Sequence, residues 1–273
     1  MTTIGEVGQR TRFDVREFAR TARGNHRESL QLSEYTLSPL NPESVRMVRY
    51  LGRLEGATME HLRNLLVTAT HKDARVTAFL VTWAFEKFWI ADALDAVLEA
   101  NGMERFQDVA EGKVRKSRSE SADRRGPIRR AVSAIRLGVP IVAVHTTTGL
   151  IDEWITRAAY LRLAAQSKSA ALASTITMIL DVKKRHQDFF DDESRRRLTD
   201  SPRAVALTRK TLLTASWPIG AVDRAAEDRS FFENYVFGGD AGVASASEIE
   251  SRVAALPGLD DRIGEAVARK LLP

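Results

Sequence analysis

The segment from Asp73 to Ala100 restricts the fold more than any other part of the chain. Its apolar residues recur at spacings of three and four positions, which is the pattern of a helix that buries one face. Asp73 provides a carboxylate for the first helical turn, and Asn101-Gly102 is typical of a helix end. The spacing therefore predicts a long helix over residues 73–100.

Three other segments have the same helical pattern. One begins at Pro42, whose missing N–H costs nothing in a first turn, and extends to about residue 70. The others cover about 141–166 and 169–190, although residues 139–144 are also compatible with a strand. Four helices of this length predict an all-α protein with a bundle core. Shorter helices are expected near 193–216, 221–237, 247–256 and 260–271.

The composition agrees with a helical protein of one domain. The chain has 273 residues, of which 44% are hydrophobic, and this is enough for a substantial core. Pro and Gly are few, at eight and 16 residues. We expect residues 1–41 to form an N-terminal arm and residues 42–190 to form the bundle core, with a charged loop at about 103–126. Residues 191–273 should add helices to the same domain.

Several classes of protein are excluded by what the sequence lacks. There is no Cys, which removes disulfide frameworks, thiolate metal sites, iron–sulfur clusters and cysteine nucleophiles. No apolar run approaches the roughly 20 residues of a membrane span, and the first residues do not have the pattern of a signal peptide. We therefore expect a cytoplasmic protein without a membrane span.

Two polar residues fall on helix faces that are otherwise apolar. Glu86 lies within the stripe that Phe79, Trp83 and Ile90 define, and His186 lies near the end of a similar stripe in residues 169–190. A buried carboxylate must be paired, hydrogen-bonded, bound to metal or neutralised, and a buried imidazole also needs a partner. A structural contact across the bundle accounts for both residues, and so does a metal or catalytic site.

The same helices resemble the ferritin-like superfamily, in particular the acyl-carrier-protein desaturases and related di-iron proteins. Residues 83–89, Trp-Ala-Phe-Glu-Lys-Phe-Trp, are similar to the family motif Trp-x-x-Glu-Glu-x-x-His. Residues 181–189 resemble its Asp-Glu-x-Arg-His-x-x-Phe motif, and residues 157–160, Arg-Ala-Ala-Tyr, resemble the run that follows an isolated Glu. The resemblance covers about residues 45–190. It implies a ferritin-like four-helix bundle, to which the C-terminal helices are added.

The family motifs are incomplete in this chain. The di-iron site of the family takes one Glu from each of two helices and a Glu-x-x-His pair from each of the other two. Carried over residue by residue, the first pair is Glu86 with Trp89 in the position of His. The second pair is His186 with Lys183 in the position of Glu, and Thr156 stands in the position of an isolated Glu. The resemblance therefore implies a degenerate metal site.

The remaining family ligand, on the helix predicted over 42–70, is Glu55 or Glu60, and the motif does not decide between them. Two interpretations follow. In the first, the metal site is lost, no cofactor is bound, and the chain is a binding or structural protein. In the second, a non-standard ligand set holds iron or manganese in an oxidase, hydroxylase or desaturase-like enzyme. The candidate ligands for that set are Glu55, Glu60, His61, Glu86, His145, Glu153 and His186.

The first interpretation predicts particular contacts. Glu86 and His186 should face each other across the interior of the bundle, with Trp89 and Lys183 in the places of two lost ligands. Lys183 should pair with Glu86 or with another carboxylate. Lys183, or an arginine such as Arg157, is the expected source of positive charge beside Glu86.

Basic residues are concentrated between Lys113 and Arg130, where eight Lys and Arg stand against Glu120 and Asp123. This stretch is either a solvated loop or a docking site for an acidic partner such as a carrier protein. It contains no aromatic residue on which bases could stack, which argues against nucleic acid. Helical bundles often bury a helix pair between subunits, so a homodimer is a further expectation.

Overall fold

The computed structural model describes residues 12–105, 138–221 and 224–273, and every regular element in these ranges is a helix. The all-α prediction is therefore confirmed. Residues 139–144, for which a strand was the alternative, include the start of helix α9 (Ile141–Ser167). The basic stretch from Lys113 to Arg130 lies outside the described residues.

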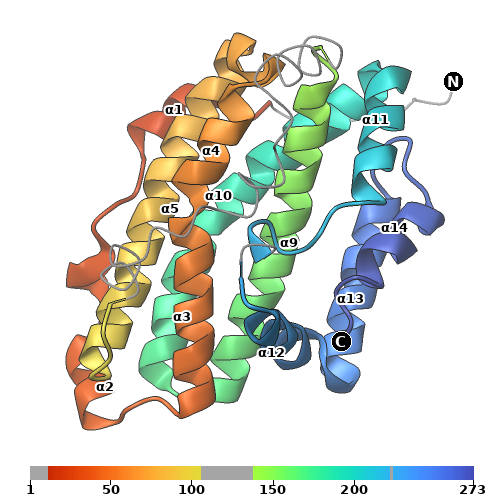
Figure 1. Cartoon of the computed structure of the whole chain (residues 1–273). Coiled ribbons are helices and arrows are strands. Elements are labelled where there is room, and N and C mark those ends of the chain that lie inside the picture. The colour runs from red at the N-terminus through yellow and green to blue at the C-terminus, as the bar shows by residue number, and fades with distance from the viewer. Residues whose placement is uncertain (1–11, 106–137, 222–223) are drawn as a thin grey trace, which may run out of the picture.

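Four helices surround the interior of the molecule (Figure 1). They are α3 (Pro42–Gly56), α5 (Ala74–Ala100), α9 and α10 (Ala170–Asp200). Helix α3 packs on α5, α9 packs on α10, and further contacts join α3 to α9 and α5 to α10. Side chains from all four helices therefore meet at the centre.

Helix α5 begins as the sequence predicts, because the Asp73 side chain accepts a hydrogen bond from the Val76 N–H. Every residue from Ile90 to Leu98 is buried, so this part of the helix is surrounded by other elements on all sides. None of the helices in the described part of the chain combines the length and apolarity that a membrane span requires.

The helix predicted over residues 42–70 is divided in the structure. Helix α3 ends at Gly56, a residue that weakens a helix interior by about 1 kcal/mol relative to Ala. Helix α4 (Thr58–Leu66) and the short 3₁₀ helix η2 (Ala69–Lys72) follow it. This division matters because residues of α4 line one side of a cavity beside the centre.

Helix α10 is longer than the sequence predicts. Its predicted end is residue 190, and in the structure it continues ten residues further, to Asp200. Glu193, Ser194 and Leu198 extend its buried face past Phe190, so packing continues where a break was expected. The next helix begins only at Pro202, after the N-cap Ser201, whose hydroxyl accepts from the Ala204 N–H.

The C-terminal helices are α11 (Pro202–Leu212), α12 (Ala226–Phe237), α13 (Gly239–Ala254) and α14 (Asp261–Ala268). Helices α11, α12 and α13 pack on α9, and Figure 1 shows this group on the side of α9 away from α5. Helix α13 begins eight residues earlier than the sequence analysis predicts.

The described part of the N-terminal arm packs mainly along α5. It contains α1 (Val15–Arg20), the 3₁₀ helix η1 (His26–Ser29) and α2 (Leu32–Leu37). Aromatic side chains fix its first part: the Phe18 ring stacks on Phe79, with 5.0 Å between ring centroids, and Phe79 stacks on Phe189. The arm thereby closes one side of the interior.

Candidate functional site

A cluster of two carboxylates and two ammonium groups lies at the centre of the four helices. Glu55 comes from α3, Lys87 from α5, Glu153 from α9 and Lys183 from α10, and each side chain is at most 5% exposed. We refer to these four residues as the central cluster. Its formal charges cancel.

Distances within the central cluster show that each lysine lies between both glutamates. Lys183 Nζ is 3.1 Å from Glu55 Oε1 and 2.7 Å from Glu153 Oε2. Lys87 Nζ is 2.9 Å from Glu55 Oε2 and 4.0 Å from Glu153 Oε1. The two ammonium groups therefore stand where cations would bridge two carboxylates.

Three members of the central cluster, Glu55, Glu153 and Lys183, keep their charges although they are buried. Burial by itself would raise the pKa of Glu153, but the positive charges of Lys183 and Lys87 outweigh this effect and hold that pKa well below its usual range. The same balance lowers the pKa of Glu55. Burial acts to lower the pKa of Lys183, and the two carboxylates raise it overall. All these directions favour the charged forms.

Two neutral donors also form hydrogen bonds with the glutamates. Tyr160 Oη donates to Glu55 Oε1 at 3.0 Å, and Trp83 Nε1 donates to Glu153 Oε1 at 3.2 Å. Burial, together with the negative charge of Glu55, raises the pKa of Tyr160 well above its usual value, so the phenol stays protonated and remains a donor.

Glu86 forms a second charged group beside the central cluster. As predicted, it faces His186 across the interior, with 2.8 Å between Glu86 Oε2 and His186 Nε2. The Arg185 guanidinium and the backbone N–H of Arg23 both donate to Glu86 Oε1, the latter at 2.7 Å. His186 Nδ1 lies 3.7 Å from Glu153 Oε1, so the imidazole separates the two groups.

Lys183 lies at the centre and pairs with a carboxylate, as the sequence predicts. Of the two alternatives, Glu86 or another carboxylate, the structure shows the second, with Glu55 and Glu153 as the partners. The positive charge beside Glu86 comes from Arg185, an arginine of α10 that immediately precedes His186 in the chain. Arg157 lies elsewhere, in a groove on the far side of α9.

Trp89 does not fill a vacated ligand position. It is half-buried under the N-terminal arm, where a Cβ atom added to Gly24 would lie 2.5 Å from Trp89 Cδ1. The indole has turned outward because position 89, three residues after Glu86, faces the arm and not the central cluster. Glycine at position 24 is what lets the arm pass over this ring.

Glu60 also lies away from the centre. It is half-buried on α4, lines a cavity, and makes no ion pair with the described residues. Its alternative in the sequence analysis, Glu55, is the one that reaches the central cluster. Position 156, where the family motif has a Glu, holds a threonine whose hydroxyl donates to the Asp152 carbonyl at 2.9 Å. The carboxylate that α9 contributes to the centre comes from Glu153, one helical turn earlier.

The side chains at the centre do not fit a pair of metal ions. Across the described ranges no three His, Asp or Glu residues are arranged so that they could hold a metal ion. A divalent cation at Glu55 and Glu153 would also meet two ammonium groups, each within 3.1 Å of a carboxylate oxygen. Iron or manganese could bind there only after both lysines had lost their protons or moved.

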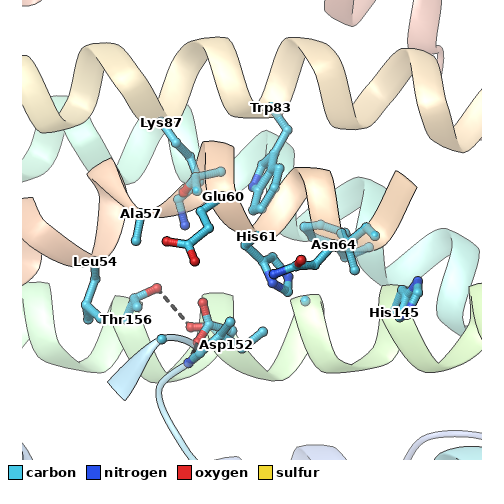
Figure 2. A pocket seen from close by; sticks show the side chains of 16 residues that line it. Leu54, Ala57, Glu60, His61, Asn64, Trp83, Lys87, His145, Asp152 and Thr156 are labelled. Carbon is cyan, nitrogen blue, oxygen red and sulfur yellow. Dashed lines mark hydrogen bonds between the residues drawn. The ribbon is translucent and has the colours of Figure 1, made fainter. Parts of the chain in front are cut away.

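A cavity of about 180 Å³ opens beside the central cluster. It lies between α4, α5 and α9 (Figure 2), and Ile219 and Gly220 also belong to its lining. Lys87, which belongs to the central cluster, and Trp83, which donates to Glu153, both line the cavity, so the two features share a wall. Gly149 and Phe190 also line the cavity, and a Cβ atom added to Gly149 would lie 2.9 Å from the Phe190 ring.

Two carboxylates and two imidazoles belong to the polar lining of the cavity, together with Lys87, Asn64 and two threonines. Figure 2 shows the side chains of Glu60 and Asp152 pointing toward one another, with His61 beside them. Asp152 is 8% exposed, and its Oδ1 accepts a hydrogen bond from the Ile219 N–H at 2.7 Å. Burial raises the pKa of Asp152 to about 6, against the opposing charge of Lys87.

The two histidines of the cavity are uncharged at neutral pH. Burial lowers the pKa of His61 to about 4, and the nearby Lys87 charge adds to this effect. Burial likewise lowers the pKa of His145 to about 4, and its Nδ1 lies 2.8 Å from the hydroxyl of Thr70 on η2. Neutral imidazoles offer one donor and one acceptor each.

Sequence reasoning missed Lys87, Asp152, Tyr160 and Arg185 as parts of the site. A signal for Lys87 was present: Leu80, Ala84, Ala91 and Leu94 place it on a second apolar face of the same helix. A helix that is apolar on two faces is buried on both, so any charge on either face needs a partner.

No protein-family model matches this chain, and comparisons with curated proteins and with solved structures also found no match.

Proposed function

We propose that this chain is a small-molecule-binding protein built on a ferritin-like four-helix bundle, in which lysine ammonium groups take the place of the metal ions. The ligand site is the cavity between α4, α5 and α9. The single observation that carries the proposal is the placement of Lys87, which pairs with Glu55 in the centre and lines the cavity at the same time.

The ferritin-like part of the proposal is supported by the source of the central side chains. Each of the four helices contributes inward-pointing charged residues at one level: Glu55 from α3, Glu86 and Lys87 from α5, Glu153 from α9, and Lys183 from α10. Ferritin-like metal centres draw their ligands from four helices in the same manner. Here the carboxylates bind ammonium groups of the same chain.

The binding part of the proposal is supported by the lining of the cavity. A rigid wall formed by Trp83 and the salt-bridged Lys87 holds the shape of the site. Glu60 and Asp152 present carboxylate oxygens to the interior, and the neutral imidazole of His61 can accept as well. A small ligand with hydrogen-bond donors and an apolar body suits this surface best.

The proposal is tested with probes of the size of the cavity. Benzylamine and phenol carry donors, whereas benzoate carries only acceptors. In protein with ¹⁵N-labelled tryptophan, we expect millimolar benzylamine or phenol to shift the indole N–H signal of Trp83 and benzoate to leave it unchanged. Ala57→Phe should abolish these shifts, because Ala57 lines the cavity.

The matched control is Ala78→Phe, which adds the same ring at an exposed position of α5. It should leave the shifts intact. The proposal would be contradicted if neither donor probe moved the Trp83 signal, or if the shifts persisted in Ala57→Phe. A stronger response to benzoate than to benzylamine would contradict the ligand chemistry.

A further inference from the structure

A second cavity, of about 210 Å³, lies between α9 and α13, on the side of α9 away from the central cluster. Its lining includes three arginines, Arg157 and Arg162 from α9 and Arg252 from α13. We call it the arginine groove. Nothing in the proposed function of the first cavity requires it.

Helix geometry explains the shape of the arginine groove. Trp154, Ala158 and Ala165 follow one another at helical spacing and form an apolar stripe along α9. Leu161 continues this stripe. Arg157 comes one residue before Ala158 and Arg162 comes one residue after Leu161, so the two arginines flank the stripe on opposite sides. The lining residues between the arginines have small side chains, Ala158 and Ala165 on α9 and Ala241 and Ser245 on α13, and these leave the space of the groove open.

Two of the three arginines are already held in place. Arg162 donates to the carbonyl oxygens of Tyr235 and Gly238, at 3.3 and 3.4 Å. Arg252 pairs with Glu248 at 2.5 Å, and its guanidinium lies over the Trp154 ring at 5.7 Å from the centroid. Both side chains are therefore fixed at the groove without needing a ligand.

Arg157 is different. It is half-buried, it lines the groove, and it makes no hydrogen bond or ion pair with any other described residue. Glu248 is the single carboxylate in the lining, so three guanidinium groups face one negative charge. Like charges brought together in a partly desolvated groove repel one another, and an anion between them relieves that repulsion.

We propose that the arginine groove binds a small organic anion, a carboxylate or phosphate ester with a compact apolar body. The Arg157 guanidinium has the planar fork of donors that binds such oxyanions in a bidentate manner. Ala158, Ala165 and the buried edge of Trp154 would cover the apolar body.

Phenyl phosphate is the probe for this site, and the indole N–H of Trp154 is the reporter. We expect phenyl phosphate to shift the Trp154 signal in a saturable manner, and we expect benzylamine, which has the same ring and the opposite charge, not to shift it. Arg157→Gln should weaken the binding by at least about tenfold, since a hydrogen-bonded charge pair is lost. Arg63→Gln, at an exposed position of α4, should leave it unchanged.

Each of the other results overturns the proposal. The proposal is overturned if phenyl phosphate shows no saturable binding. It is also overturned if Arg157→Gln and Arg63→Gln weaken phenyl phosphate binding equally, since this would indicate only a general attraction of the anion to a basic protein. If anionic lipid vesicles bind while phenyl phosphate does not, the groove is a membrane contact and not a small-molecule site. Because Trp83 reports on the first cavity and Trp154 on the groove, the two proposals fail separately.

Discussion

Replacing Lys183 by methionine is expected to lower the free energy of unfolding by about 3–5 kcal/mol. Methionine retains most of the volume but removes the ammonium group that lies 2.7 Å from Glu153 and 3.1 Å from Glu55. One negative charge is then left without compensation in a site where both carboxylates are buried. Urea unfolding followed by circular dichroism measures the loss.

Two further variants make this result specific. Lys184→Met removes the neighbouring lysine, which forms an exposed pair with Asp188 at 2.7 Å, and should cost less than about 1 kcal/mol. Adding Glu153→Gln to Lys183→Met should recover part of the stability, because it removes the uncompensated charge. If Lys183→Met were as stable as the parent, the ammonium group would not be neutralising the central carboxylates.

Glu86→Ala is expected to destabilise the chain by a similar amount, roughly 3–5 kcal/mol. The carboxylate accepts hydrogen bonds from Arg185, from His186 Nε2 at 2.8 Å and from the backbone N–H of Arg23 at 2.7 Å. Its removal leaves His186 Nε2 and the Arg23 N–H without this acceptor, while Arg185 keeps its bonds to Thr21, and a cavity takes the place of the side chain. The N-terminal arm should also loosen, since Arg23 anchors it to α5 through this contact.

Limited proteolysis distinguishes this second effect from global destabilisation. In Glu86→Ala, cleavage within the arm should become faster under conditions where the four-helix core is still folded. Glu17→Ala, which breaks an exposed pair with Arg20 in the same arm, should change neither the unfolding midpoint nor the cleavage rate. Glu86→Ala with the parent's stability and the parent's cleavage rate would show that this carboxylate does not hold the arm.

The helices could be predicted from the sequence where a single strong pattern decided them. The sequence predicts helix α5 over residues 73–100, and the helix spans Ala74–Ala100 in the structure. Its start is marked by Asp73, its end by Asn101-Gly102, and the apolar spacing between them is uninterrupted. The pattern failed at Gly56, because a glycine within an apolar spacing does not reveal whether the helix continues. It failed again beyond residue 190, where tertiary contacts at Leu198 continue α10 through a strongly charged segment.

The candidate site was predictable only in part for a related reason. Periodicity shows that Glu86 and His186 point inward, and their contact follows from it. The partners of Lys183 depend on how far α3 and α9 are rotated and shifted along their axes, which a single sequence does not state. Glu153 lies one turn from the position that the family motif indicates, and that one turn decides whether the centre has a second carboxylate.

The central claim is that Lys87 and Lys183 neutralise Glu55 and Glu153 in place of metal ions. It is tested most directly by the metal content of the 273-residue protein, purified without chelators from cells grown with added iron and manganese. Inductively coupled plasma mass spectrometry should find well under one equivalent of either metal per chain. A stoichiometric pair of iron or manganese ions, lost on replacement of Glu55 or Glu153 by glutamine, would contradict the account.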